Sequence, residues 1–199
     1  MSTPTALPPT PRGEATRRKL LNAAEKEFAE KGFHGASVSH ITQRADVGQG
    51  TFYLYFRSKE EIFTTLVRDI GHQLRAHSAS RVTGAKDRLE AERLGLEAFL
   101  DFASRHPGLY RIVQESQFVD ETVFREYYEK LAEGYAAGLD RASRKGELRP
   151  GHAEARAWAL MGIGHFIGQR WCLWKQQAPP PEVLDEVMQL LRHGLEPRK

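Results

Sequence analysis

The spacing of apolar residues is that of an α-helix along nearly the whole chain. Leu20, Ala24 and Phe28 recur every four residues, with Thr16 as the expected N-cap and Gly32 as the expected helix end. No segment alternates apolar and polar residues between hairpin turns, as half-buried strands do. The pattern therefore predicts an all-α protein.

Two short helices are expected after the first. One covers residues 38–45 and the other residues 49–56, with Asp46–Gly48 as a tight link between them. A long helix then runs from Ser58 to about Gly84. Further helices are predicted over residues 86–105, 107–117, 121–145, 152–176 and 181–194, which makes about nine in all.

The composition indicates a soluble globular protein, because 40% of the residues are hydrophobic and 28% are charged. No apolar run approaches the ~18 residues that span a bilayer, and the N-terminus lacks the pattern of a signal peptide. The single cysteine, Cys172, allows no internal disulfide. We therefore expect a cytoplasmic protein with no membrane partner.

The net charge of +3 is unevenly distributed. Residues 1–60 hold nine basic and six acidic side chains, so the rest of the chain has no net charge. A basic excess confined to one part of a chain is typical of a segment that faces phosphates. It is also compatible with an ordinary solvated surface.

Two short helices joined by a tight turn are typical of a helix-turn-helix, whose second helix enters the major groove of DNA. Successive helical residues lie about 100° apart, so Phe52 and Phe56 share one face of the second helix. We expect this face to pack inward. The opposite face carries Gly50, Thr51, Leu54 and Tyr55.

The run from Thr16 to Phe63 resembles the DNA-binding domain of TetR-type repressors. The residues in register are Ala23-Ala24, Phe28, Gly32, Ser37-Val38, Ile41, Val47, Gly50-Thr51-Phe52-Tyr53, Tyr55-Phe56 and Lys59-Glu60. Asp46 stands where such families usually carry glycine, and Gly48 stands where they often carry serine. The chain thus lacks the usual N-cap side chain of the recognition helix.

Four prolines among the first dozen residues predict a flexible tail over residues 1–13. The resemblance implies a DNA-binding domain over residues 14–60 and a ligand-binding and dimerisation domain over residues 61–199. Base contacts are implied for Ser39, Gln43, Gln49 and Thr51, and phosphate contacts for Ser37, Tyr53, Tyr55 and Lys59. Gly50 would let the backbone approach the DNA closely. His40 and Arg44 are weaker candidates. Alternatively, Tyr53 and Tyr55 only pack in the core, and the serines only cap helices.

The last two predicted helices are candidates for dimerisation. Glycine inside a helix costs ~1 kcal/mol relative to alanine, so Gly162, Gly164 and Gly168 indicate a close approach of another backbone. The resemblance implies a four-helix dimer interface here, although both helices could simply cover their own core. The interface residues predicted are Gly164, Gly168, Trp171, Val183, Val187, Leu190 and Leu191.

Aromatic residues between these regions are expected to form the core and, by the resemblance, a pocket for an inducer. The predicted ligand contacts are Phe99, Phe102, Tyr110, Phe124, Tyr127, Tyr128, Trp158, Met161 and His165. The stretches around His106–Val113 and Gly162–Trp171 are similar to regulators of fatty-acid or phenylacetate catabolism. This likeness implies an acyl-CoA thioester as the inducer.

The sequence indicates no metal site, no cofactor and no enzyme active site. Its eight histidines are scattered, and it has no phosphate-binding loop or nucleophile motif. Our interpretation is a homodimeric repressor that a small molecule releases from a palindromic operator. Two alternatives stay open: a nucleoid-type protein without sequence preference, and an all-α enzyme or ligand-binding protein with a vestigial DNA-binding head.

Overall fold

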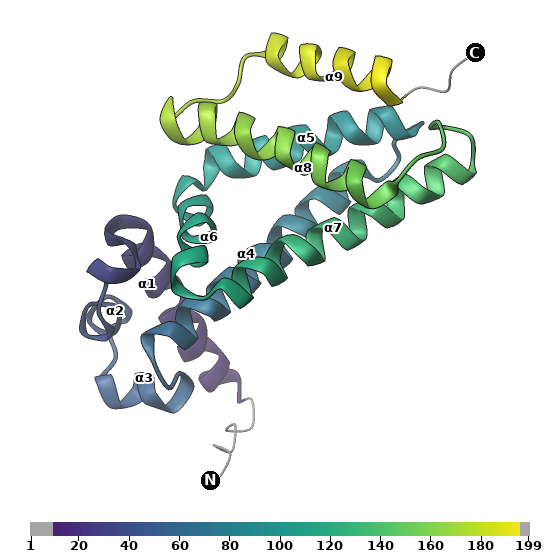
Figure 1. The fold of residues 1–199 in the computed structure, drawn as a ribbon. Helices are drawn as coiled ribbons and strands as arrows, with labels where there is room; N and C mark the ends of the chain where they lie inside the picture. Colours follow the sequence, from purple (N-terminus) through teal and green to yellow (C-terminus); the bar gives the residue numbers. More distant parts are fainter. Residues whose placement is uncertain (1–9, 196–199) are drawn as a thin grey trace. The chain divides into compact units, whose positions relative to one another are not determined.

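A computed structural model describes residues 10–195, which form nine α-helices, one short π-helical segment and no β-strand (Figure 1). The all-α prediction is therefore confirmed. The helices are α1 (Pro11–Gly35), α2 (Val38–Ala45), α3 (Gln49–Tyr55), α4 (Lys59–Val82), α5 (Arg88–Arg105), α6 (Pro107–Val119), α7 (Glu121–Arg144), α8 (Ala153–Gly168) and α9 (Pro181–Leu195), with the π-helical segment η1 (Gln169–Trp174) directly after α8. No helix in this range has the length and apolar character needed to cross a membrane.

Helix α1 begins earlier than expected. Its N-cap is Thr10, whose side chain accepts a hydrogen bond from the Gly13 N–H at 3.1 Å, so the prediction of Thr16 as the cap is wrong. Pro11 is accommodated because the first turn of a helix needs no N–H donor there. Of the expected flexible tail, residues 10–13 are thus part of or cap α1, and residues 1–9 lie outside the described range.

Gly32 interrupts α1, as the sequence predicts. Its φ of 69° and ψ of 173° are not helical, and one further turn continues to Gly35. Glycine adopts this positive φ without the steric cost that a Cβ would add. The break turns the chain towards α2.

The contacts divide the described chain into two compact units. Unit 1 contains the residues up to Asp69 and the segment Gly108–Phe124, so it holds α1 to α3, the start of α4 and nearly all of α6. Its core is aromatic and aliphatic: Phe28 meets Phe63 edge to face with ring centroids 5.1 Å apart, and Ile112 of α6 is fully buried. Helix α6 is therefore a structural part of unit 1, although it is distant in sequence.

Unit 2 contains Ile70–Pro107 and the residues from Arg125 onward. Within it, α5 packs against α8, η1 and α9 (Figure 1). One part of its core joins α7, α8 and α9 through Leu139, Leu148, Leu160 and Met188. The helix expected over residues 152–176 has nearly the predicted extent, but its last six residues are π-helical.

Candidate nucleic-acid interface

Helices α2 and α3 form the predicted helix-turn-helix. The side chain of Ser37 caps α2 by accepting the His40 N–H at 3.2 Å. Asp46 ends α2 in the left-handed conformation, with φ 54° and ψ 52°, and its N–H donates to the carbonyls of Thr42 and Gln43. The short side chain of aspartate tolerates this conformation, so the usual glycine is not required.

Helix α3 has no side-chain cap. Gly48 takes the N-cap position in an extended conformation, and only its main-chain carbonyl participates, accepting the Thr51 N–H at 2.9 Å. The absent cap is therefore confirmed. A built Cβ at Gly48 would meet no atom within 4 Å, so the position has room for a side chain.

The inward face of α3 is also as predicted. Phe52 and Phe56 are buried, with exposed fractions of 0% and 2%, and their ring centroids lie 5.8 Å apart. The guanidinium carbon of Arg17 lies 5.6 Å from the centroid of the Phe56 ring. The Arg17 contact links the end of α3 to α1, and the rest of α3 is left available.

The outward face differs in detail from the helical-wheel expectation. Tyr53 and Leu54 are the large exposed residues, at 56% and 64%, whereas Thr51 and Tyr55 are half-buried. The early start of α1 explains why Tyr55 is half-buried, because the Tyr55 hydroxyl lies 3.6 Å from a Cβ built on Gly13. The remaining predicted contacts on α2 and α3 are exposed: Ser39, Gln43, Gln49 and Gly50.

Lys59 has a structural role that the sequence did not indicate. Its ammonium donates to the carbonyls of Phe33 and Ala36 at 2.8 and 2.9 Å, and it lies 4.3 Å from the centroid of the Phe33 ring. Two of the three N–H donors are thus used within the protein. A phosphate contact by Lys59 stays a prediction.

Arg44 is similarly engaged by acidic residues of α1. Its guanidinium donates to both carboxylate oxygens of Glu30, at 2.9 and 2.6 Å, and to Glu27 at 2.8 Å. Glu27 is buried and also pairs with Lys31 at 2.8 Å. Burial acts to raise the pKa of Glu27, but the bonds from Lys31 and Arg44 outweigh it and hold that pKa below its usual value. This cluster joins α1 to α2.

The comparisons with known proteins agree with this geometry. Residues 20–66, which span most of α1, all of α2 and α3 and the start of α4, match the model of the family described as bacterial regulatory proteins, tetR family. Over residues 20–66 the chain thus has a helix-turn-helix segment of the tetR type. The proteins that it resembles are described as transcriptional regulators.

Similar proteins match most of the length of this chain. It is 29% identical to the uncharacterised HTH-type transcriptional regulator YdgC of Bacillus subtilis, covering 94% of this chain and 96% of that one. It is 28% identical to the HTH-type transcriptional activator FasR of Mycolicibacterium smegmatis, over 81% and 74% of the two chains.

Solved structures share the fold at lower identity. The fatty acid degradation regulator FadR of Bacillus halodurans has a TM-score of 0.79 and 21% identity, over 93% of this chain and 96% of that one. FadR of Bacillus subtilis, solved in complex with stearoyl-CoA, has a TM-score of 0.76 and 20% identity, over 87% and 96%. At this identity the likeness establishes the fold alone.

The predicted ligand contacts do not all lie in one unit. Tyr110 and Phe124 belong to unit 1, and the other seven belong to unit 2. In unit 2, the Tyr128 hydroxyl lies 3.4 Å from Nδ1 of His165, and the Tyr128 ring stacks near Trp158 with centroids 6.4 Å apart. Burial lowers the pKa of His165 and raises the pKa of Tyr128 to about 12, so both are uncharged at neutral pH.

Three of the predicted dimer contacts are buried within the chain itself. Gly164, Gly168 and Leu191 all belong to the interior of unit 2. A Cβ built on Gly164 would lie 3.4 Å from Leu96 and 3.6 Å from Phe99 of α5. The close approach that the glycines indicated is therefore, at Gly164, to α5 of the same chain.

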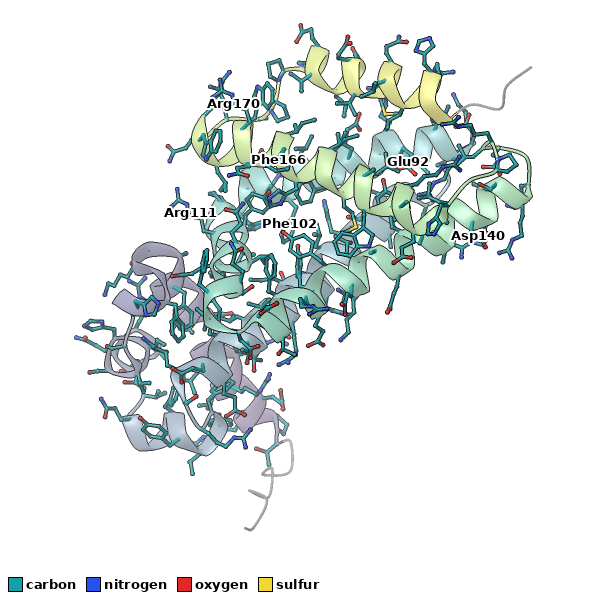
Figure 2. All side chains as sticks on the ribbon, viewed as in Figure 1. Glu92, Phe102, Arg111, Asp140, Phe166 and Arg170 are labelled. Carbon is teal, nitrogen blue, oxygen red and sulfur yellow. The ribbon has the colours of Figure 1, made fainter. Side chains whose placement is uncertain are left out.

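Other apolar residues of the same helices are exposed, including two that the sequence reasoning missed. Phe166 of α8 and Trp174 of η1 are 69% and 64% exposed, and the predicted contact Leu190 of α9 is 65% exposed. Figure 2 shows Phe166 and Arg170 on the α8–η1 helix. Trp171, Val183 and Val187 are half-buried. Within residues 10–195, no cluster of three histidine, cysteine or acidic side chains could hold a metal ion.

Proposed function

We propose that this protein is a homodimeric TetR-family repressor that binds a palindromic operator and leaves it when a small molecule binds. The observation that carries the proposal is the exposed face of α2 and α3. Phe52 and Phe56 hold α3 in place, while Gln43, Gln49 and Tyr53 extend into solvent. Side chains of these types recognise base edges and phosphates.

In this proposal Ser39, Gln43, Gln49 and Thr51 contact bases, and Ser37, Tyr53 and Tyr55 contact phosphates. Gly50 is exposed and no atom lies within 4 Å of its built Cβ, so nothing in the chain hinders an approach of DNA there. Lys59 is also a proposed phosphate contact, through its third N–H, because the other two donate to main-chain carbonyls.

Selection of bound sequences from a random DNA pool tests the specific binding. We expect a palindromic sequence to be enriched, and Gln43→Ala to weaken binding about 5- to 100-fold, as for the loss of a base contact. Glu133→Ala, an exposed position on α7 in unit 2, is the control. Binding without enrichment would favour the nucleoid-type alternative. No DNA binding, with ligand binding intact, would favour the vestigial head.

The proposed inducer is an acyl-CoA thioester. Tyr128 and His165 are uncharged polar groups among aromatic side chains of unit 2, which suits a thioester carbonyl attached to an apolar chain. The FadR structure with stearoyl-CoA supports the same class of ligand. The proposed contacts in unit 2 are Phe99, Phe102, Tyr127, Tyr128, Trp158, Met161 and His165, of which Figure 2 labels Phe102 on α5.

Titration with stearoyl-CoA, stearate and free coenzyme A distinguishes the parts of this ligand. We expect only stearoyl-CoA to release the regulator from its selected DNA. His165→Ala should weaken stearoyl-CoA binding about tenfold, roughly the effect of one lost hydrogen bond. Release by none of the three compounds would refute the acyl-CoA proposal and leave the DNA-binding proposal intact.

We propose that the dimer forms through exposed apolar residues of α8, η1 and α9. Phe166, Trp174 and Leu190 expose large apolar surfaces that water solvates poorly. Sedimentation should find a dimer for the wild type and a monomer for Phe166→Glu with Leu190→Glu. Two added charges outside the interface would leave the sedimenting species a dimer. If the double variant is still a dimer, the interface therefore lies elsewhere.

The inducer releases the regulator from its operator if it binds a conformation that cannot bind DNA. The size of the effect depends on how much more tightly the inducer binds that conformation than the DNA-binding one. Helices α4 and α7 each continue from unit 1 into unit 2, and the start of α6 joins unit 2 at Pro107, so the chain offers three covalent routes for this coupling. The relative FasR is an activator. A reporter gene behind the selected operator therefore tests the sign: we expect deletion of the regulator to raise expression.

A further inference from the structure

The break in α1 leaves a main-chain donor that another helix satisfies. After the non-helical Gly32, the Phe33 N–H donates to both carboxylate oxygens of Glu115 in α6, at 2.8 and 2.9 Å. All of these residues belong to unit 1. A hydrogen bond to a charged acceptor is stronger than a neutral one. Glu115 thus acts as the cap of the last turn of α1.

The carbonyls of the same turn are held from another direction. Lys59, at the start of α4, donates to the carbonyls of Phe33 and Ala36. A negative group therefore binds the N–H side of residues 33–36 and a positive group binds the carbonyl side. The next residue is Ser37, the cap of α2 and a proposed phosphate contact.

A second contact fixes the position of α6 along α1. A Cβ built on Gly108 would lie only 2.5 Å from the Cβ of Ala29, so glycine allows the two helices to approach closely. Gly108, Ile112 and Glu115 recur at intervals of four and three residues, which places them on one face of α6. Ile112, between the other two, is fully buried. These contacts therefore restrict movement of α6 along the axis of α1.

We propose that Glu115 is a positioning residue for DNA binding. Its carboxylate fixes the turn at residues 33–36, and this turn sets the orientation in which Ser37, α2 and α3 are presented. The Phe33 ring anchors the turn further, because it packs against Phe28 and Phe63 in the core. The inference rests on the proposed sequence-specific binding and assigns part of it to a residue on a helix that does not touch DNA in that proposal.

Three substitutions separate positioning from charge. Glu115→Ala removes the acceptor. Glu115→Asp keeps the charge but withdraws the oxygens by one methylene, and Glu115→Gln keeps an oxygen in place without the charge. Gln117→Ala is the control, because Gln117 is exposed on the same helix and its side chain bonds only the Gln114 carbonyl, one turn away. Binding is measured on the selected duplex and on a scrambled duplex of the same length.

We expect Glu115→Ala to bind the selected duplex at least tenfold more weakly, with little change on the scrambled duplex and a similar melting temperature. Exchange of the Phe33 amide hydrogen should become faster. Glu115→Gln should stay within about threefold of wild type, and Glu115→Asp should be weaker than Glu115→Gln. If Glu115→Ala does not fold, the test is the order in which Glu115→Gln and Glu115→Asp bind the selected duplex.

Two results would overturn the inference. A folded Glu115→Ala variant that prefers the selected duplex as strongly as wild type does would show that Glu115 does not position the helix-turn-helix. Glu115→Asp binding better than Glu115→Gln would assign the effect to charge. A wild type without any preference for the selected duplex would instead refute the proposed function, and the positioning role with it.

Discussion

The hydroxyl of Tyr135 in α7 donates a hydrogen bond to the carboxylate of Glu92 in α5, inside unit 2. Glu92 is 2% exposed, accepts a hydrogen bond of 2.6 Å from Nε of Arg88 and forms an ion pair with Nη2 of Arg88 at 2.6 Å, and the Arg88 guanidinium lies over the Tyr135 ring. Figure 2 labels Glu92 within this part of the structure. The buried carboxylate of Glu92 thus joins α5 to α7, because it binds both the Arg88 guanidinium and the Tyr135 hydroxyl.

This group gives the first prediction, on pH dependence. Burial raises the pKa of Glu92 above its usual value of 4.5, against the opposing effects of Arg88 and Tyr135. A carboxylate with a raised folded-state pKa contributes its full stability below 4.5, and this contribution is lost as the pH rises towards the folded-state pKa. Chemical denaturation from pH 4.5 upward should therefore show the unfolding free energy of the wild type falling relative to that of Glu92→Gln.

The control for Glu92 is its alanine variant. Glu92→Ala should lose about 3 kcal/mol of unfolding free energy at pH 7, because the mostly buried Arg88 is left without its partner. An unchanged stability of Glu92→Ala would mean that water replaces the carboxylate without cost.

The second prediction concerns the uncapped recognition helix. Gly48 already has the extended conformation of an N-cap and has room for a side chain. Gly48→Ser should therefore stabilise unit 1 by about 0.5 kcal/mol, since serine is a slightly better cap than glycine. It should also tighten DNA binding by adding a hydroxyl near the phosphates. Thermal denaturation and binding to the selected duplex measure the two effects, and Gly48→Ala, which cannot cap, separates the cap from the loss of glycine flexibility.

The third prediction concerns acid unfolding of unit 1. The pKa of Glu27 lies below its usual value of 4.5, so its contribution to stability is present above that pH and is lost as the pH falls through the folded-state pKa. Arg44→Ala removes one of the two cations and should move acid unfolding, followed by circular dichroism, to higher pH. Arg57→Ala breaks a more exposed pair with Glu61 and should leave the transition in place. Equal shifts in both variants would argue against a special role for Glu27.

The fourth prediction uses two glycines of α8 that are two residues apart. A Cβ on Gly162 would meet no atom within 4 Å, whereas a Cβ on Gly164 would contact Leu96 and Phe99. Gly164→Leu should therefore destabilise the folded chain by about 1–3 kcal/mol through overpacking. Gly162→Leu should leave folding intact and weaken the dimer if Gly162 faces a partner. Denaturation and sedimentation of both variants give the comparison, and a reversed pattern would contradict the packing described for α8.

Local patterns predicted the helices and the inward face of α3 correctly. The reason is that periodicity, caps and breaks such as Ser37 and Gly32 depend on neighbouring residues in the sequence. The start of α1 was missed because a proline in the first dozen residues indicates a tail or the first turn of a helix equally well, and only Thr10 as the cap distinguishes them.

The contacts that the sequence did not reveal are distant ones. Glu115 binds a main-chain N–H that lies 82 residues away, and Lys59 binds carbonyls 26 and 23 residues away. Every residue type has the same main-chain carbonyl, and every residue except proline the same N–H, so no sequence motif identifies a main-chain partner. Gly164 was assigned to a dimer interface because sequence cannot distinguish a close approach within the chain from one between chains.

The π-helical segment after α8 limits how the end of this helix can be altered. A π-helical turn holds more residues than an α-helical turn, so Gln169–Trp174 accommodates the equivalent of an inserted residue. Deleting one residue there would restore the α-helical repeat and shift the residues inside the segment, whereas the helix before it would keep its register. Cys172 would then leave its contacts with Ser104 and the Leu100 carbonyl. We therefore expect substitutions in this segment to be tolerated far better than single-residue deletions.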